Sequence, residues 1–132
     1  LICDQYNMID LHCPGILWKE HELIHMVGSK NEKYAESEAR FASSLAKYTC
    51  DKELVFDEIS ILRYETSWNN DRSELQGDSF KTWGQQQFPD SKLVCTFEIP
   101  YASNKGQKVT IENLNEFGEA MSYAIADFLK KD

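Results

Sequence analysis

The sequence predicts an α/β domain with a mixed, mostly parallel sheet flanked by helices in three layers. Segments rich in β-branched and aromatic residues alternate with segments whose apolar residues recur at helical intervals. The predicted order is strand, helix, strand, short helix, strand, helix, which is typical of a partly parallel sheet covered by helices. The length of 132 residues suits one compact core. We therefore treat residues 1–132 as a single domain.

Three segments predict the strands. Residues 7–13 are mostly apolar and end at Pro14-Gly15, which suits a buried strand closed by a turn. Residues 54–64 are rich in β-branched and aromatic types, although an acidic pair interrupts them. Residues 92–99 form an apolar run that predicts a strand buried on both faces.

Three further segments predict helices. Residues 29–48 open with Ser29 and Glu32 in capping-box spacing, and their apolar residues recur at helical intervals: Tyr34, Phe41, Leu45 and Tyr48. After a loop at 67–77, Ser79 is placed to cap a short helix that runs to Phe88.

The last predicted helix spans residues 110–131, with Thr110 as its N-cap. One face carries the apolar residues Leu114, Phe117, Met121, Ile125 and Phe128.

Charge and composition exclude some partners. The 22 acidic residues outnumber 14 basic ones, for a net charge of -8, and no basic stripe is present, which argues against nucleic acid. No apolar run approaches the roughly 20 residues that span a bilayer, so no membrane partner is expected. The chain begins Leu-Ile-Cys-Asp without Met, and we interpret this start as a cut through a longer protein.

The four cysteines show no Cys-x-x-Cys pair, so a structural zinc knot is not expected. Cys13 and Cys95 are expected to be core residues. A disulfide between Cys3 and Cys50 is an open alternative if the protein is exported to a periplasm or secreted, because spacing alone does not fix connectivity.

Two polar residues stand at the ends of predicted strands. Glu98 interrupts an apolar strand, and a buried carboxylate must be paired, bound to metal or functional because its desolvation is costly. The alternative is that Glu98 lies at a fraying strand end and reaches water. His12 follows a predicted strand in the same way, and ligands bind at the C-terminal ends of parallel strands in open α/β sheets. A hydrogen-bonded structural histidine is the alternative there.

The flanking residues resemble a known family. Asp10-Leu11-His12-Cys13-Pro14 looks like the Asp-x-His segment that supplies the third zinc ligand of zinc metallocarboxypeptidases of the carboxypeptidase A/B type. Residues 96–102, Thr-Phe-Glu-Ile-Pro-Tyr-Ala, are similar to the family's Thr-x-Glu strand in bacterial members. Residues 77–83 resemble the segment ahead of that strand, and the separation of His12 from Glu98, 98 minus 12 or 86 residues, is of the family's order.

The resemblance implies that this chain is the C-terminal half of such a catalytic domain. Its parent would be a zinc exopeptidase that removes C-terminal residues from peptides, with bacterial cell-wall peptides as one option. His12 would be a zinc ligand and Glu98 the general base and acid. Asp10 lies two residues from His12 on the same face of the predicted strand, where it would either support His12 or, as we favour, have a plain structural role. Two further zinc ligands belong to the missing N-terminal half, so we expect this chain alone to be inactive.

The resemblance also implies a substrate pocket lined by residues 77–83, with Ser79, Phe80 and Trp83 as its candidate residues. The family places a tyrosine on a mobile loop ahead of the glutamate, and residues 65–97 contain no Tyr. Trp68, Arg72 and Trp83 are candidates to replace it, or this member works without that contact.

A rival motif predicts a different enzyme. His21-Glu22-Leu23-Ile24-His25 is a His-Glu-x-x-His sequence, which on a helix would bind zinc through His21 and His25 with Glu22 as base. Such a zincin metalloprotease needs a third ligand, for which Glu36 or Glu38 are generic candidates. On a strand the two histidines would lie about 13 Å apart, too far for one ion. A non-catalytic binding module is the remaining alternative.

Overall fold

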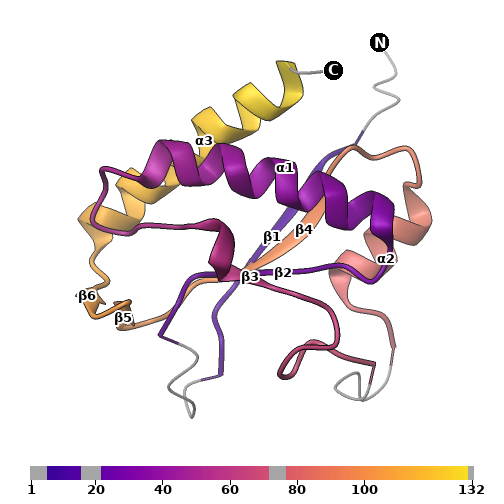
Figure 1. Ribbon diagram of the computed structural model, residues 1–132, viewed down its shortest axis with the longest axis horizontal. Coiled ribbons are helices and arrows are strands. Elements are labelled where there is room, and N and C mark those ends of the chain that lie inside the picture. Colours follow the sequence, from indigo (N-terminus) through magenta and orange to yellow (C-terminus); the bar gives the residue numbers. More distant parts are fainter. Residues whose placement is uncertain (1–5, 16–21, 72–76, 131–132) are drawn as a thin grey trace.

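The computed structural model describes residues 6–15, 22–71 and 77–130 (Figure 1). In chain order its elements are β1 (Met8–His12), β2 (His25–Val27), α1 (Glu32–Thr49), the 3-10 turn η2 (Glu58–Ser60), β3 (Ile61–Leu62), α2 (Phe80–Gln87), β4 (Val94–Glu98), β5 (Ser103–Asn104), β6 (Gln107–Lys108) and α3 (Ile111–Lys130). None of the helices in these ranges is long and apolar enough to cross a membrane.

A four-stranded sheet of order β1-β4-β2-β3 lies at the centre of the fold. β1 pairs with β4 in parallel, β2 pairs with β3 in parallel, and β2 pairs with β4 antiparallel. β5 and β6 form a separate hairpin between β4 and α3. The predicted α/β class with a mixed sheet is therefore confirmed.

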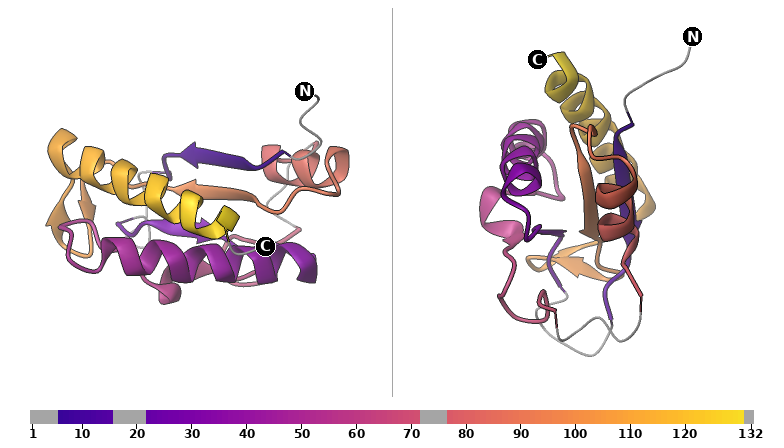
Figure 2. Two further views of the ribbon diagram at one scale, coloured as in Figure 1. Left: turned by 90° about the horizontal axis from the view of Figure 1, so that it is seen from above. Right: turned by 90° about the vertical axis from the view of Figure 1, so that its right-hand side faces the viewer.

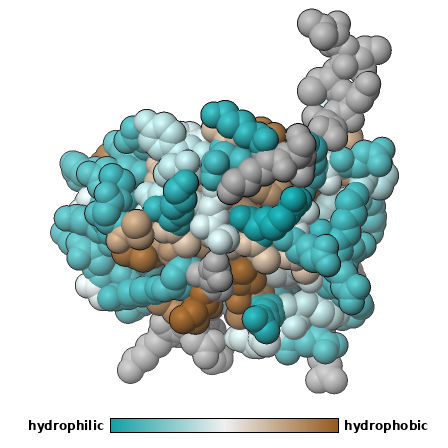
Figure 3. All heavy atoms as spheres, turned by 45° about the horizontal axis from the view of Figure 1, so that its top comes forward, coloured by the Kyte–Doolittle hydropathy of each residue, from teal (hydrophilic) through white to brown (hydrophobic). Residues whose placement is uncertain are grey.

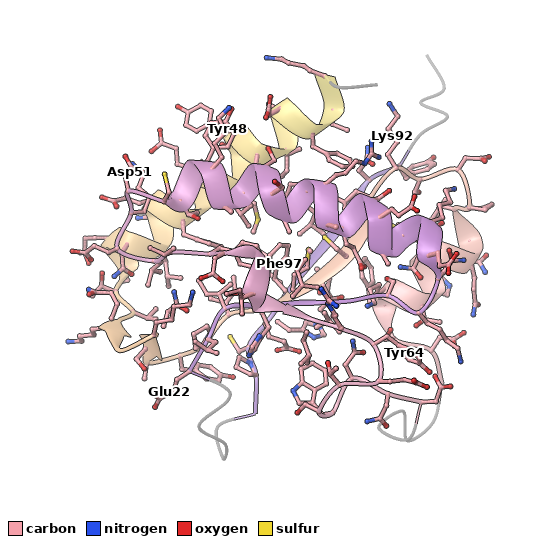
Figure 4. All side chains as sticks on the ribbon, viewed as in Figure 1. Glu22, Tyr48, Asp51, Tyr64, Lys92 and Phe97 are labelled. Atoms are coloured by element: carbon pink, nitrogen blue, oxygen red, sulfur yellow. The ribbon has the colours of Figure 1, made fainter. Side chains whose placement is uncertain are left out.

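One face of the sheet carries the hydrophobic core beneath α1 and α3. Successive residues of a strand point to opposite faces, and Cys95 and Phe97 of β4 belong to the core cluster. The ring of Phe41 on α1 packs edge-on against Phe97, with centroids 6.1 Å apart, and against Phe128 on α3, at 5.8 Å. Figure 2 shows both helices on this side of the sheet, and Figure 4 shows Phe97 beneath α1.

The opposite face is covered by α2 only where β1 and β4 begin. Val94 of β4 and Met8 of β1 point to this face, and both side chains contact Gly84 of α2. Helices therefore lie on both sides of the sheet, as the three-layer prediction requires. The C-terminal ends of β1 and β4 extend beyond this contact, and their polar side chains share this second face.

Local hydrogen bonds confirm the starts of two predicted helices. The Ser79 hydroxyl accepts from the Thr82 amide at 3.1 Å and caps α2. Before α3, the Thr110 hydroxyl accepts from the Asn113 amide at 3.2 Å, and the Asn113 side chain accepts from the Thr110 amide at 2.8 Å. On α3, however, Leu114 of the predicted apolar face is exposed, because the buried face of the helix includes Asn113, Ala120 and Ala124 instead.

The predicted start of the first helix was wrong. Asn31 caps α1 through its side chain, which accepts from the Lys33 amide at 3.0 Å. Ser29 lies two residues earlier and uses its hydroxyl and its amide on the buried carboxylate of Glu38 instead.

A strand is present within residues 54–64, as predicted, but it comprises only Ile61 and Leu62. Leu54 and Phe56 are buried, but the Phe56 backbone bonds to the hydroxyl of Thr49 rather than to a strand. Leu54 and Phe56 are thus buried without pairing in a sheet, which explains why this part of the sequence has a strand-like pattern.

The predicted burial of Cys13 and Cys95 is confirmed for only one of the two residues. Cys95 is buried, as predicted, and burial raises the pKa of its thiol well above the ordinary value. Cys13 is exposed, so its placement in the core was wrong, because β1 ends one residue earlier at the sheet's rim. Cys50 is a free, exposed thiol, and Cys3 lies outside the described residues.

Close packing of α2 on the sheet gives the first prediction. A Cβ at Gly84 would lie 3.0 Å from Met8 Sδ and 3.0 Å from Val94 Cγ1, whereas a Cβ at Gly118 of α3 would meet nothing within 4 Å. We expect Gly84→Val to lower the free energy of unfolding by about 1–3 kcal/mol through overpacking. Gly118→Val should change it by less than about 0.5 kcal/mol. Urea denaturation of both variants checks this, and equal effects would contradict the close approach.

Candidate functional site

His12 and Glu98 lie side by side at one rim of the sheet. They are directly opposite in the parallel β1–β4 register, and the Ile99 amide donates to the His12 carbonyl at 2.8 Å just beyond them. Both side chains alternate with residues of the core face, so both point to the second face. The two residues that sequence reasoning singled out are thus neighbours in space.

Asp10 supports His12 from the same strand and the same face. Oδ2 of Asp10 lies 3.0 Å from Nε2 of His12, and the Thr96 hydroxyl donates to the same oxygen at 3.4 Å. The Asp10 side chain is 18% exposed and that of His12 is 56% exposed, so the carboxylate holds the ring from the protein side. Because this contact uses Nε2 of the ring, Nδ1 is the nitrogen that can bind another partner.

His25 lies on the other side of Glu98. It is directly opposite Glu98 in the antiparallel β2–β4 register, while Val27 is opposite Thr96. Residues paired in this way share a face, with Cβ atoms about 4.5–5.5 Å apart. The rim therefore has the order His12, Glu98, His25 on three adjacent strands.

Tyr101 and Cys13 extend this rim beyond the strands. A hydrogen bond with the Cys13 thiol and the nearby charge of Glu98 raise the pKa of the Tyr101 phenol. The Tyr101 side chain is exposed. It is therefore a protonated, solvent-accessible hydroxyl group near Glu98.

A cavity of about 540 Å³ lies beside the C-terminal end of β2, toward the beginning of β4 and away from Glu98. Its volume is within the range of ligand pockets, about 300–1,000 Å³. It is lined by Val27, Gly28, Ser29, Lys30, Asn31, Tyr64, Trp68, Asn69, Asn70, Asp71, Ser79, Lys81, Thr82 and Gln85. Because β2 runs antiparallel to β4, the residues that follow Val27 lie toward the start of β4, and neither His12, His25 nor Glu98 lines the cavity.

The loop after β3 forms one wall of this cavity. Lys30 pairs with Asp71 at 2.8 Å, and the Tyr64 hydroxyl also bonds to the Asp71 carboxylate. The hydrogen bond from Lys30 and the one from Tyr64 lower the pKa of Asp71. Asn69 anchors the loop by donating to the carbonyls of Gly28 and Leu62 at 2.9 and 2.8 Å. Tyr64 thus brings a phenol to the cavity from just before residues 65–97.

The candidate pocket residues are divided between the cavity and the surface. Ser79 and Trp68 line the cavity. Phe80 and Trp83 are exposed on α2, where their rings lie 6.3 Å apart, and neither is among the cavity-lining residues. Arg72 lies outside the described residues.

A buried ionic cluster adjoins the cavity through Ser29 and Lys81. The Glu38 carboxylate accepts from the Ser29 amide at 2.8 Å and from the Ser29 hydroxyl at 2.5 Å, and Lys81 Nζ lies 4.0 Å away. Lys81 also donates to the carbonyls of Val27 and Gly28 at 2.8 and 3.1 Å. Desolvation raises the pKa of Glu38, and the charge of Lys81 and the bonds from Ser29 oppose that rise.

The described part of the His-Glu-x-x-His motif is not helical. His25 begins a strand, and the exposed Glu22 lies in a bend ahead of it. His21 lies outside the described residues. Of the proposed third ligands, Glu36 is exposed and Glu38 is engaged by Ser29 and Lys81. Figure 4 shows Glu22 well apart from Tyr64 of the cavity wall.

The described residues contain no ready-made group of metal ligands. Across 6–15, 22–71 and 77–130, no three His, Cys, Asp or Glu side chains are gathered so that they could hold a metal ion. His12 offers one imidazole donor at the rim, whereas a catalytic zinc needs about three protein ligands.

No protein-family model, curated protein or solved structure matches the chain significantly. The geometry of the rim is therefore the basis for the function proposed below.

Sequence reasoning missed the positions of His25, Tyr101 and Lys81 in this site. His25 occurs in a short apolar run, Ile24 to Gly28, which is compatible with a strand, but no local pattern places that strand beside Glu98. Lys81 lies on a helix that was correctly predicted, yet its burial follows from the fold of β2 and α1, which no local pattern reveals.

The buried pair Glu38–Lys81 gives the second prediction. We expect Lys81→Met to destabilise the protein by about 3–5 kcal/mol at neutral pH, because the Glu38 charge is left buried without its cation. Burial raises the pKa of Glu38 in the folded state, so in the pH range of this titration the folded protein binds more protons than the unfolded chain. The contribution of Glu38 to the free energy of unfolding therefore falls as pH rises. The loss should therefore shrink as pH falls and Glu38 becomes protonated.

The measurement is chemical denaturation at a series of pH values. The double variant Lys81→Met/Glu38→Gln removes both charges and should recover more than half of the loss at neutral pH. Additive losses in the double variant would show that the two side chains do not interact.

Proposed function

We propose that this chain is the C-terminal part of a zinc metallocarboxypeptidase that releases C-terminal residues from peptides. The observation that carries the proposal is the in-register pairing of His12 with Glu98 at the rim of two parallel strands. The two motifs that resemble the family lie far apart in sequence, and they would have to meet for the proposed chemistry. A specific carboxypeptidase-like fold is part of the same proposal.

In this proposal Glu98 performs the proton transfers. Its carboxylate accepts a proton from the attacking water and then gives that proton to the amine of the departing residue. Its place on the central strand of the sheet keeps the carboxylate in a fixed position between β1 and β2. Tyr101, whose exposed hydroxyl bonds to Cys13 near Glu98, would be a candidate hydrogen-bond donor to a substrate oxygen.

His12 would contribute one zinc ligand, positioned by Asp10. Zinc, when bound, polarises the scissile carbonyl as a Lewis acid. In this proposal the other two ligands come from the N-terminal half of the catalytic domain, as the family resemblance implies. The chain alone is then expected to be inactive.

The edge of the sheet supports a preceding half. β1 lies at the edge of the four-stranded sheet, where its outer side can pair with another strand. Leu11 points to the face that α1 and α3 cover, yet it is 56% exposed. Further apolar side chains are exposed on α3, namely Ile111, Leu114 and Leu129. Figure 3 shows hydrophobic patches, in brown, on a mostly hydrophilic face of the molecule.

The third prediction concerns Glu98. In the full-length protein, Glu98→Gln should lower kcat by at least about 10²- to 10⁴-fold, because the amide cannot accept the proton. The release of single C-terminal residues, followed by mass spectrometry, measures the loss, and zinc content should be unchanged. Glu22→Gln is the matched control and should retain full activity. Internal cleavage that depends on Glu22 instead would establish the zincin alternative.

A further inference from the structure

His25 has a place in the rim that the proposed reaction does not yet use. It lies opposite Glu98 in the β2–β4 register, on the side away from His12, and its side chain shares the face of the Glu98 carboxylate. Glu98 therefore has an imidazole on each neighbouring strand. His12 is 56% exposed in its side chain, whereas His25 is only partly exposed and lies nearer the centre of the sheet.

The position of His25 is fixed from outside the rim. The amide of Ile24, just before it, donates to Asn104 Oδ1 at 3.0 Å. Asn104 is 2% exposed, and its own amide donates to the Val55 carbonyl at 2.9 Å. The Lys105 amide also donates to the Glu22 carbonyl at 3.0 Å. The β5–β6 hairpin thus holds the start of β2 in place, and a side chain on such a rigid element is preorganised.

We propose that His25 is a positioning residue whose imidazole donates a hydrogen bond to one carboxylate oxygen of Glu98. A carboxylate has two oxygens, and the other oxygen then faces the water from which it takes the proton. A neutral imidazole carries one N–H donor, which suits this role without removing the negative charge of the base. The inference rests on the proposed function, and it names how the general base of that same site is oriented.

The groups around Glu98 have separate roles in this arrangement. Asp10 binds His12 on the β1 side, and Tyr101 bonds to Cys13 beyond the strand ends. His25 is the group that faces Glu98 from β2. Misplacement of a reacting group by about 1 Å can cost roughly 10²-fold in rate, so an orienting contact at this carboxylate has a measurable effect.

Two variants of His25 in the full-length, zinc-loaded protein test the role. His25→Phe keeps a ring but removes the donor, and kcat should fall about 10- to 100-fold with KM and zinc content unchanged. His25→Gln keeps an N–H donor and should recover most of kcat. Unchanged kcat in His25→Phe, or equal losses in the two variants, would overturn the proposal.

A spectroscopic measurement on the 132-residue chain is independent of activity and of folding losses in the His25 variants. The ¹⁵N shifts of the His25 ring nitrogens report which nitrogen carries the proton and whether it is hydrogen-bonded. Glu98→Gln should move the His25 signals, while Asp10→Asn should move those of His12. Unchanged ¹⁵N shifts of His25 in the Glu98→Gln variant would refute the contact.

The two experiments also separate this inference from the proposed function. If Glu98→Gln leaves full-length activity intact, the proposed function fails, whatever the His25 signals show. If Glu98→Gln abolishes activity and the His25 variants do not, only the positioning role fails.

Discussion

The pairing of β1 with β4 is the constraint on which the candidate site depends. These strands are parallel, so their C-terminal ends reach the same rim, and the register places His12 beside Glu98. Backbone bonds mark both ends of the pairing, from the Met8 amide to Leu93 at 2.9 Å and from the Ile99 amide to His12 at 2.8 Å. A slip of one residue in this register would turn Glu98 toward the hydrophobic core beneath α1 and α3, where a charged side chain is costly to desolvate.

The two faces of the sheet have different physical roles. The face beneath α1 and α3 buries aromatic rings around Phe97 and supplies most of the hydrophobic stabilisation. The second face is covered by α2 at one end only, and polar side chains occupy the rest. Lys81 joins these parts, because it reaches from α2 to the carbonyls after β2 and toward Glu38 of α1. The cavity is therefore bounded by groups that also hold α2 and α1 to the sheet.

Local patterns predicted the elements whose signals are local. The hydroxyls of Ser79 and Thr110 cap their helices as predicted, and the apolar runs at β1 and β4 are strands. The errors occur where tertiary contacts override a local signal. Ser29 has capping-box spacing, yet the buried carboxylate of Glu38 takes its hydroxyl.

The same limit applies to the candidate site. His12 and Glu98 could be singled out because polar residues at the ends of apolar strands are unusual. The proximity of His25 could not be predicted, because β2 is only three residues long and its register is fixed by Asn104, far away in the sequence. The cavity also depends on the loop from Tyr64 to Asp71, which is anchored by Asn69 and Lys30 rather than by regular structure.

The alternative for Glu98 was a fraying strand end whose carboxylate simply reaches water, and the topology argues against it. β4 is an inner strand with β1 on one side and β2 on the other, so its end is paired on both sides at Glu98 itself. Beyond it the chain continues through the bond from Ile99 to His12 and through the buried Pro100. A charge held at such a position is costly to desolvate unless polar neighbours compensate. The histidines on the flanking strands are the residues placed to do so.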